Sequence, residues 1–325
     1  MDDYSPEVET AIQAAIQASA LCERIRGDLA TGEFLLKSDR SPVTIADYGS
    51  QALICQFIKN RFPNDSIVAE EDSKELRRPD RSNILQQVTG YVSSFVPASS
   101  SEVCSWIDFG SDSVSDRFWT LDPIDGTKGF LRGDQYAIAL ALIEKGSVAL
   151  GILACPKLHG KVHRPRGGKG CLFFAIKGKG SFQTDLAGAN KRAIHVSRVR
   201  NPSEAVITES VETDHADHLT HQRLAEKMNI SRPFLKIDSQ AKYGLVARGE
   251  ATFYLRVPSS AEPRYKENIW DHAAGAIIAE EAGGRVTDVM GRILDFSSGT
   301  RMEKNHGILA SNRILHEAIL KALEM

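Results

Sequence analysis

Two aspartates, Asp122 and Asp125, lie three residues apart at the end of an apolar run and are followed by Gly126 and Thr127. Clustered carboxylates repel one another unless a cation lies between them, and an all-oxygen ligand set favours Mg²⁺ or Mn²⁺ over zinc. A helix that began at Gly126 would direct its free N–H groups and the positive end of its dipole at the same point, where a phosphate could bind. The alternative is an Asp-Pro turn capped by glycine, because short motifs often occur by chance.

Two further acids could join this pair. Glu70 follows the apolar residues 66–69, and Asp271 precedes a helical run that closes with Gly283 and Gly284. Each also has an ordinary structural interpretation. Glu70 could belong to a solvated acidic turn, and Asp271 could be the N-cap of its helix.

The elements that must position these acids are predicted from hydrophobic periodicity and from turn residues. In the first half we expect one helix that begins near Ser5 and ends at Gly32, a second helix over 44–62 and then a short strand. An irregular polar insertion over 74–117, with one helix near 84–88, separates these from an antiparallel sheet. The expected strands are 66–69, 118–121, 136–143, 148–154 and 172–176. In the second half we expect short strands that alternate with helices, which is typical of an α/β layered domain. These are strands 205–208, 234–237 and 251–257 and helices 215–228, 271–282 and 314–323. The predicted domains are 1–190, α+β with most of the metal ligands, and 191–325, α/β with the nucleotide-binding residues and Asp271.

Composition limits the class of protein. The 325 residues are 42% hydrophobic and 25% charged, with 40 Lys and Arg against 42 Asp and Glu. Such a balance is typical of a globular protein and provides no overall field for nucleic acid or an anionic membrane. No apolar run approaches the roughly 20 residues of a membrane span, and the amino terminus does not resemble a signal peptide, so we expect a cytoplasmic protein. Five scattered cysteines without CxxC spacing argue against disulfides and thiolate metal sites.

Four acidic motifs occur in order along the chain: V-T-I-A-D at 43–47, E-E at 70–71, D-P-I-D-G-T at 122–127 and W-D-H-A-A-G at 270–275. Together they resemble the lithium-sensitive inositol monophosphatase superfamily, over nearly the whole chain. The resemblance implies a layered α-β-α-β-α sandwich of two domains.

By the same resemblance, Glu70, Asp122 and the carbonyl of Ile124 hold one Mg²⁺, and Asp122, Asp125 and Asp271 hold a second. A third ion beside Glu70 is also implied, so we expect two or three. Asp47 and Thr127 are similar to the family's pair that orients and activates the attacking water. The structural alternative for Asp47 is a capping box with Thr44.

Within the superfamily, the stretch 126–133 and its Lys128-Gly129-Phe130 resemble the 3'(2'),5'-bisphosphate nucleotidases. That likeness implies a small nucleotide as substrate, held by Gly126, Thr127, Ser239, Lys242 and Arg256. Where that group has a histidine near the base, this chain has Glu212. His215 either replaces that histidine or is a surface residue.

The expected reaction is therefore hydrolysis of adenosine 3',5'-bisphosphate to AMP and phosphate by a monomer. 3'-Phosphoadenosine 5'-phosphosulfate is a possible second substrate. Two alternatives stay open: an inositol phosphate or sugar bisphosphate as substrate, and a non-catalytic sensor of nucleotide or metal. The basic residues within 157–169 are not interleaved with aromatic residues, on which nucleic-acid bases would stack. We therefore expect a solvated hairpin tip there and not a nucleic-acid site.

Overall fold

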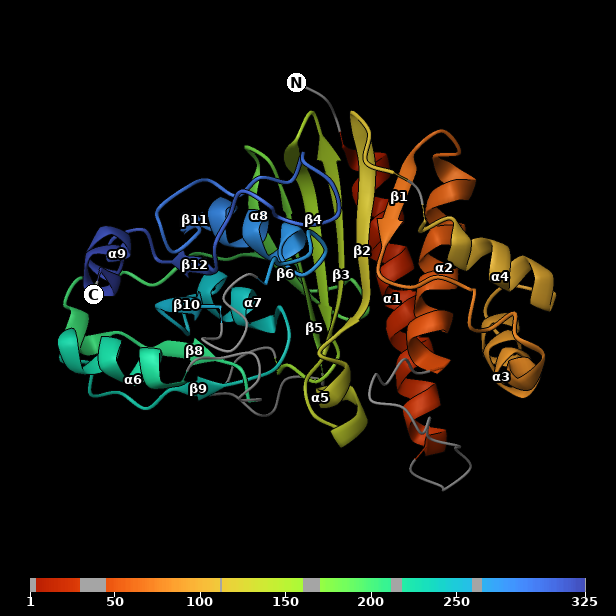
Figure 1. Cartoon of the computed structure of the whole chain (residues 1–325), viewed down its shortest axis with the longest axis horizontal. Helices are drawn as coiled ribbons and strands as arrows, with labels where there is room; N and C mark the ends of the chain where they lie inside the picture. Colours follow the sequence, from red (N-terminus) through yellow and green to blue (C-terminus); the bar gives the residue numbers. More distant parts are fainter. Residues whose placement is uncertain are drawn as a thin grey trace.

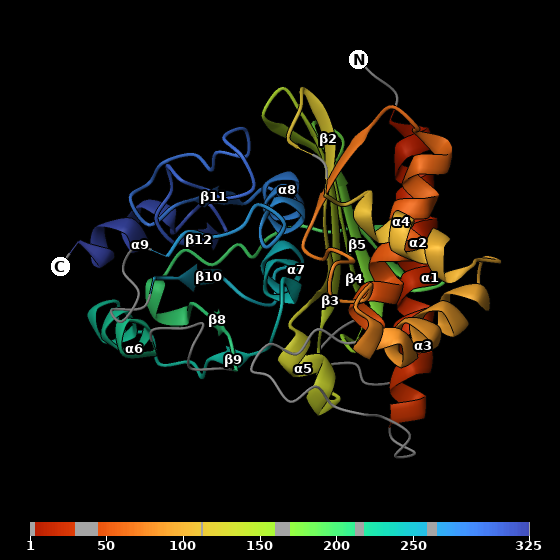
Figure 2. The same ribbon diagram turned by 45° about the vertical axis from the view of Figure 1, so that its right-hand side comes forward.

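A computed structural model describes residues 4–29, 45–111, 113–159, 170–211, 218–258 and 265–324. Four helices cover one face of a large sheet (Figures 1 and 2): α1 (Ser5–Leu29), α2 (Ile45–Arg61), α3 (Ser82–Ser93) and α4 (Ser100–Asp108). The first two confirm the predicted helices over their described lengths, while Gly32 and Thr44 lie outside the described residues. None of the described helices is long and apolar enough to cross a bilayer.

The segment 74–117 was predicted wrongly in part. Instead of an irregular insertion with one short helix, it contains a 3-10 turn (Pro79–Arg81), α3 and α4. The side chain of Ser99 accepts a hydrogen bond from the backbone N–H of Glu102, and the Glu102 carboxylate accepts one from the N–H of Ser99. This capping box starts α4 in the serine-rich stretch 99–101, which lies in the segment expected to be irregular. Serine favours helix starts as much as turns.

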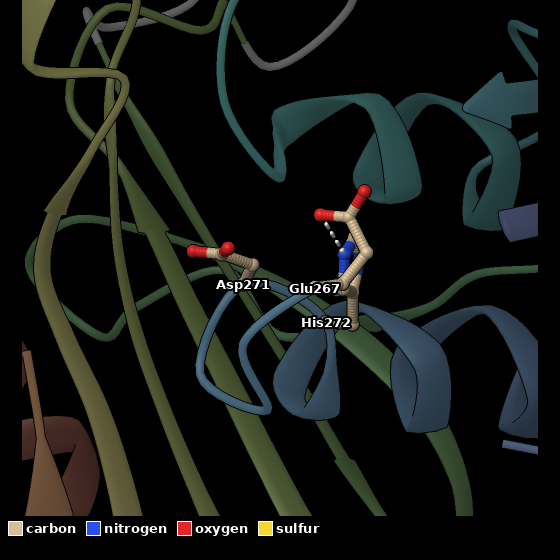
Figure 3. Close-up of side chains that lie close together, drawn as sticks. All are labelled: Glu267, Asp271 and His272. Atoms are coloured by element: carbon tan, nitrogen blue, oxygen red, sulfur yellow. Dashed lines mark hydrogen bonds and ion pairs between the residues drawn. The ribbon is translucent and has the colours of Figure 1, made fainter. Parts of the chain in front are cut away.

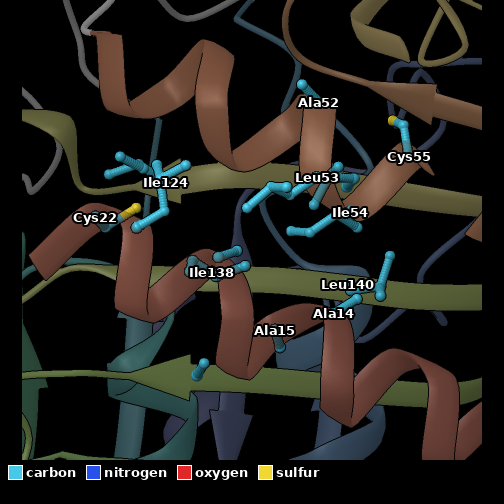
Figure 4. Close-up of a cluster of buried hydrophobic side chains, with 14 of the residues drawn as sticks. Ala14, Ala15, Cys22, Ala52, Leu53, Ile54, Cys55, Ile124, Ile138 and Leu140 are labelled. Atoms are coloured by element: carbon cyan, nitrogen blue, oxygen red, sulfur yellow. The ribbon is translucent and has the colours of Figure 1, made fainter. Parts of the chain in front are cut away.

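The large sheet has seven strands in chain order: β1 (Ser66–Ala69), β2 (Arg117–Asp125), β3 (Ala137–Glu144), β4 (Ser147–Cys155), β5 (Cys171–Ile176), β6 (Gly180–Asp185) and β7 (Arg192–Ala193). β2 to β7 pair antiparallel, as predicted for β2 to β5, whereas β6 and β7 were not predicted, and β1 pairs parallel with β2. Figure 4 shows residues of α1 and α2, among them Ala15 and Leu53, packed over Ile138 and Leu140 of β3. All five cysteines are free and buried.

A second sheet has five strands in the order β11-β12-β10-β8-β9. They are β8 (Ile207–Glu209), β9 (Leu235–Lys236), β10 (Phe253–Arg256), β11 (Arg285–Thr287) and β12 (Ile308–Ser311). α7 (Ala241–Ala247) and α8 (Ala273–Glu281) lie between the two sheets, while α6 (His218–Lys227) and α9 (His316–Leu323) cover the outer face of the smaller one (Figure 2). The layers therefore follow the predicted order α-β-α-β-α. α7, β11 and β12 were not predicted, and the division at residue 190 stays a prediction.

Candidate functional site

Residues from both halves of the chain line a cleft of about 350 Å³. Most of the predicted metal and substrate residues line it: Glu70, Asp122, Ile124, Asp125, Gly126, Thr127, Ser239, Lys242, Arg256 and Asp271. The fold thus brings together acids that are about 200 positions apart in the sequence.

The end of β2 supplies the central part of the cleft. The pairing of β2 with β3 shifts register between Asp122 and Asp125, so the two aspartates lie on either side of an irregularity in the strand pairing. Asp122 Oδ1 accepts a hydrogen bond from the N–H of Ile124 at 3.0 Å, and the Thr127 hydroxyl donates to the carbonyl of Ile124 at 3.1 Å. Gly126 has φ +87°, and the six-residue helix α5 (Thr127–Arg132) begins directly after it. The expected helix start at Gly126 and Thr127 is confirmed, and β2 is longer than the predicted 118–121.

Glu70 and Asp47 approach the site from the helical side. Because β1 pairs in parallel with β2, with Ala69 beside Leu121, Glu70 emerges next to Asp122. The Glu70 N–H also donates to the carbonyl of Leu121 at 3.3 Å. Asp47 lies in the first turn of α2, is 2% exposed and is not among the residues that line the cleft. Its charge nevertheless raises the pKa of Glu70, so the two carboxylates lie close enough to interact.

Asp271 precedes α8, whose N-cap is His272, so the alternative that made Asp271 the N-cap is wrong. Its carboxylate accepts a weak hydrogen bond from Asn268 Nδ2 at 3.4 Å. Among the described residues, Glu267, Asp271 and His272 each have a possible ligand atom within 4.8 Å of the others. Figure 3 shows Asp271 pointing away from the other two, toward the large sheet.

The other two residues of that set belong to a hydrogen-bonded chain. Glu267 binds Arg256 Nε at 2.8 Å and His272 Nε2 at 3.2 Å, and His272 Nδ1 bonds to the hydroxyl of Tyr243 at 2.9 Å. Both ring nitrogens of His272 are therefore used, and the charge of Glu267 is balanced by Arg256. This arrangement leaves Asp271 as the member of the set that faces the cleft.

Three carboxylates of the cleft have raised pKa values. Burial, with the charges of Asp271 and Asp47, raises the pKa of Glu70 to about 8. Burial and the charge of Glu70 raise the pKa of Asp122 well above its ordinary value. Burial raises the pKa of Asp271 to about 6, although His272 and Arg256 oppose the rise. A buried group of oxygen donors with these raised pKa values fits a hard divalent cation such as Mg²⁺, which would favour the ionised forms.

Two cations, Lys242 and Arg256, also line the cleft. Lys242 is 4% exposed, and burial lowers its pKa to about 8. Its ammonium donates to the carbonyl of Ile237 at 3.3 Å and lies 5.3 Å from the ring centroid of Tyr254. Arg256 is held by Glu267, as described above. Ser239 has φ +72°, a left-handed conformation that non-glycine residues seldom adopt, and its Oγ accepts from the N–H of Ala241 at 3.2 Å. Fixed cations beside clustered carboxylates can bind a substrate that carries more than one phosphate.

Sequence reasoning gave no individual binding or catalytic role to several other residues that line the cleft: Lys128, Gly129, Ser210, Asp238, Gln240, Tyr254, Tyr265 and Asn268. Asp238 accepts hydrogen bonds from Arg132 and from the N–H of Val211. Asp238 and Gln240 flank Ser239, which the resemblance assigns to substrate binding, so their position next to it was the available signal. Glu212, His215 and 160–169, with most of the basic loop, lie outside the described residues.

Comparison with known proteins agrees with this geometry. The model of the inositol monophosphatase family matches residues 3–325. A 3'(2'),5'-bisphosphate nucleotidase of Oryza sativa is 43% identical over 340 residues, which cover 99% of this chain and 94% of the relative. Proteins of the same name from Schizosaccharomyces pombe and Dictyostelium discoideum are 39% and 42% identical, cover 98% and 97% of this chain, and are each matched over 95% of their own length.

Solved structures share the fold at lower identity. The IMPase of Thermotoga maritima superposes with a TM-score of 0.64 at 23% identity, over 98% of this chain and 96% of the other. The extragenic suppressor protein suhB of Bartonella henselae gives a TM-score of 0.66 at 21% identity, over 98% and 99%. Because the family model spans almost every residue and the layers agree with these structures, the chain belongs to the inositol monophosphatase family.

Proposed function

We propose that this chain is a 3'(2'),5'-bisphosphate nucleotidase that hydrolyses the 3'-phosphate of adenosine 3',5'-bisphosphate to give AMP and phosphate. The observation that carries the proposal is that one cleft is lined by the carboxylates Glu70, Asp122, Asp125 and Asp271 together with the cations Lys242 and Arg256. The relatives of that name, which match the chain nearly from end to end, support the same reaction. 3'-Phosphoadenosine 5'-phosphosulfate is a second candidate substrate.

Enzymes of this family generally depend on Mg²⁺, and the donor set of the cleft suits it. Glu70, Asp122 and the carbonyl of Ile124 would hold one ion, and Asp122, Asp125 and Asp271 a second, with a possible third beside Glu70. When bound, such ions lower the pKa of a water molecule and stabilise the charge of the leaving oxygen.

The chain's own residues orient the reactants. Asp47 and Thr127 hold the attacking water, and Gly126 and Thr127 bind the phosphate that is cleaved. Ser239, Lys242 and Arg256 bind the part of the nucleotide that is not cleaved, since a second phosphate needs fixed cations of its own. His215 is proposed to lie near the base. A monomer in the cytoplasm is part of the same proposal.

The test is phosphate release in Mg²⁺ from adenosine 3',5'-bisphosphate and, separately, from inositol 1-phosphate. We expect the nucleotide to be the better substrate, and a preference for the inositol ester would overturn the assignment. Asp122→Asn should abolish turnover, because the carboxylate shared by both ions loses its charge. Asp80→Asn, at an exposed aspartate on the 3-10 turn, is the control that should keep full activity. Undiminished activity in Asp122→Asn would remove the metal assignment.

A further inference from the structure

Gln51, on α2, is completely buried, and its amide binds the backbone beside Glu70. Its Nε2 donates to the carbonyl of Glu71 at 2.6 Å and to the carbonyl of Ile107 at 2.9 Å. Its Oε1 accepts from the N–H of Glu71 at 3.1 Å. Both backbone groups of the residue after Glu70 are thus fixed by one side chain.

Gln240 makes the corresponding bonds around Asp271. It is 3% exposed, its Nε2 donates to the carbonyl of Trp270 at 2.8 Å, and its Oε1 accepts from the N–H of Gly275 at 3.1 Å. Its own backbone N–H donates to the carboxylate of Asp125. Gln240 therefore links the carboxylate of Asp125, in the first half of the chain, to the backbone beside Asp271, in the second half.

Glycine makes room for one of the two amides, and the residue before the other has a strained backbone. A Cβ on Gly110 would lie 2.7 Å from Gln51 Nε2, so only glycine fits beside that side chain. Ser239, immediately before Gln240, has φ +72°, and a Cβ on Gly126 would lie 3.1 Å from the Cβ of Ser239. A backbone conformation of this kind costs energy and persists where the surrounding structure over-determines it, often at functional sites.

An amide suits this position for an electrostatic reason. It offers a donor and an acceptor together, so it can satisfy a backbone carbonyl and a backbone N–H without adding charge beside the carboxylates. A carboxylate or an ammonium in the same place would change the charge that the site presents to a cation. Partners that orient metal ligands in this way typically change metal affinity about 10–100-fold when they are removed.

We propose that Gln51 and Gln240 are positioning residues that hold Glu70 and Asp271 at the spacing needed for divalent cations. The inference rests on the proposed function in one respect, that these carboxylates and Asp125 bind metal. Neither glutamine takes part in the reaction itself.

The experiment measures binding of Mn²⁺, followed by electron paramagnetic resonance of the free ion, to the wild-type chain and to Gln51→Met and Gln240→Met. Methionine keeps the length of the side chain and removes both hydrogen-bonding groups. Asn312→Leu is the matched control. Asn312 is also a buried amide that donates to one backbone carbonyl, Val199 at 2.9 Å, and accepts from one N–H, Leu315 at 3.1 Å, but it does not line the cleft. Thermal unfolding of all four proteins in EDTA reports stability without metal.

We expect all three variants to unfold at a lower temperature than the wild type, and only the two glutamine variants to bind Mn²⁺ about 10-fold more weakly or worse. Wild-type affinity in either glutamine variant would remove that glutamine from the proposal, and an equal loss in Asn312→Leu would reduce both to ordinary structural residues. If a methionine variant does not fold, Gln240→Asn or Gln51→Asn takes its place, because the shorter amide cannot reach both backbone groups. Absence of Mn²⁺ binding by the wild type would instead refute the proposed metal site itself.

Discussion

Glu267→Gln tests whether the buried pair of Glu267 and Arg256 stabilises the fold and holds the arginine at the cleft. The substitution keeps the shape of the side chain and removes its charge. Arg256 would lose the carboxylate that binds its Nε at 2.8 Å, and His272 would lose the partner of its Nε2 at 3.2 Å. An uncompensated guanidinium would then remain in a largely buried position.

The size of the effect follows from the pKa of Glu267. Burial opposes ionisation, yet the charge of Arg256 and the hydrogen bond from His272 lower the pKa from 4.5 to about 2. One pKa unit corresponds to about 1.4 kcal/mol, so the ionised carboxylate contributes on the order of 3 kcal/mol to the free energy of unfolding. A pKa lowered in the folded state stabilises above the unfolded value. The contribution is therefore complete above about pH 4.5 and is lost as the pH falls toward 2.

Urea unfolding at pH 7 and at several lower pH values measures this difference. We expect Glu267→Gln to be less stable than the wild type by on the order of 3 kcal/mol at pH 7, with a gap that narrows below pH 4.5. Glu317→Gln is the control, because Glu317 pairs with Arg285 at the surface and is 73% exposed, so its loss should cost less than about 1 kcal/mol. A gap at pH 7 no larger than that of Glu317→Gln, or one that does not change with pH, would refute the reasoning.

Three further predictions concern the cleft, the packing and a helix cap. Lys242→Met should raise KM for adenosine 3',5'-bisphosphate about 10-fold or more while kcat changes less, because a hydrogen bond to a charged group contributes about 1.5–3 kcal/mol. In the wild type the same KM should rise as the pH increases through about 8, where the buried ammonium loses its proton; a KM constant from pH 7 to 9 would contradict this role. Gly151→Ala should destabilise by about 1–3 kcal/mol in urea unfolding, since a Cβ there would lie 2.4 Å from Ile277, whereas Gly90→Ala, with open space around it, should stabilise by about 0.5–1 kcal/mol. Ser99→Ala should cost about 1 kcal/mol and should increase hydrogen exchange at the start of α4, and unchanged exchange would argue against the capping box.

Much of the fold could be predicted because its signals are local. Alternating and continuous apolar runs identified β3, β4 and β5, and helical periodicity identified α1 and α2. The segment 74–117 shows the limit of such reasoning. α4 begins in a serine-rich stretch that is also typical of loops, and what anchors it includes a contact with a distant residue, the bond from Gln51 to the carbonyl of Ile107 near its end.

The candidate site, too, could be predicted only in part from the sequence. The motifs around Glu70, Asp122 and Asp271 indicate a metal site because, in this order along the chain, they resemble the acidic motifs of the family. The roles of Asp238 and Gln240 were not predicted, since their side chains bind backbone groups and Arg132 far along the chain, and no spacing in the sequence records such bonds.

The sequence by itself therefore determined the residue types available for chemistry, the order of the acidic motifs and most of the helices and strands that carry them, because these depend on neighbours within a few positions. Only the tertiary structure decided that Arg256 is balanced by Glu267, that Asp47 lies close enough to Glu70 to raise its pKa, and that Gln51 and Gln240 fix the loops beside the carboxylates. The physical reason is that electrostatic balance and hydrogen-bond satisfaction depend on distance in space, which the fold sets between residues that the sequence separates.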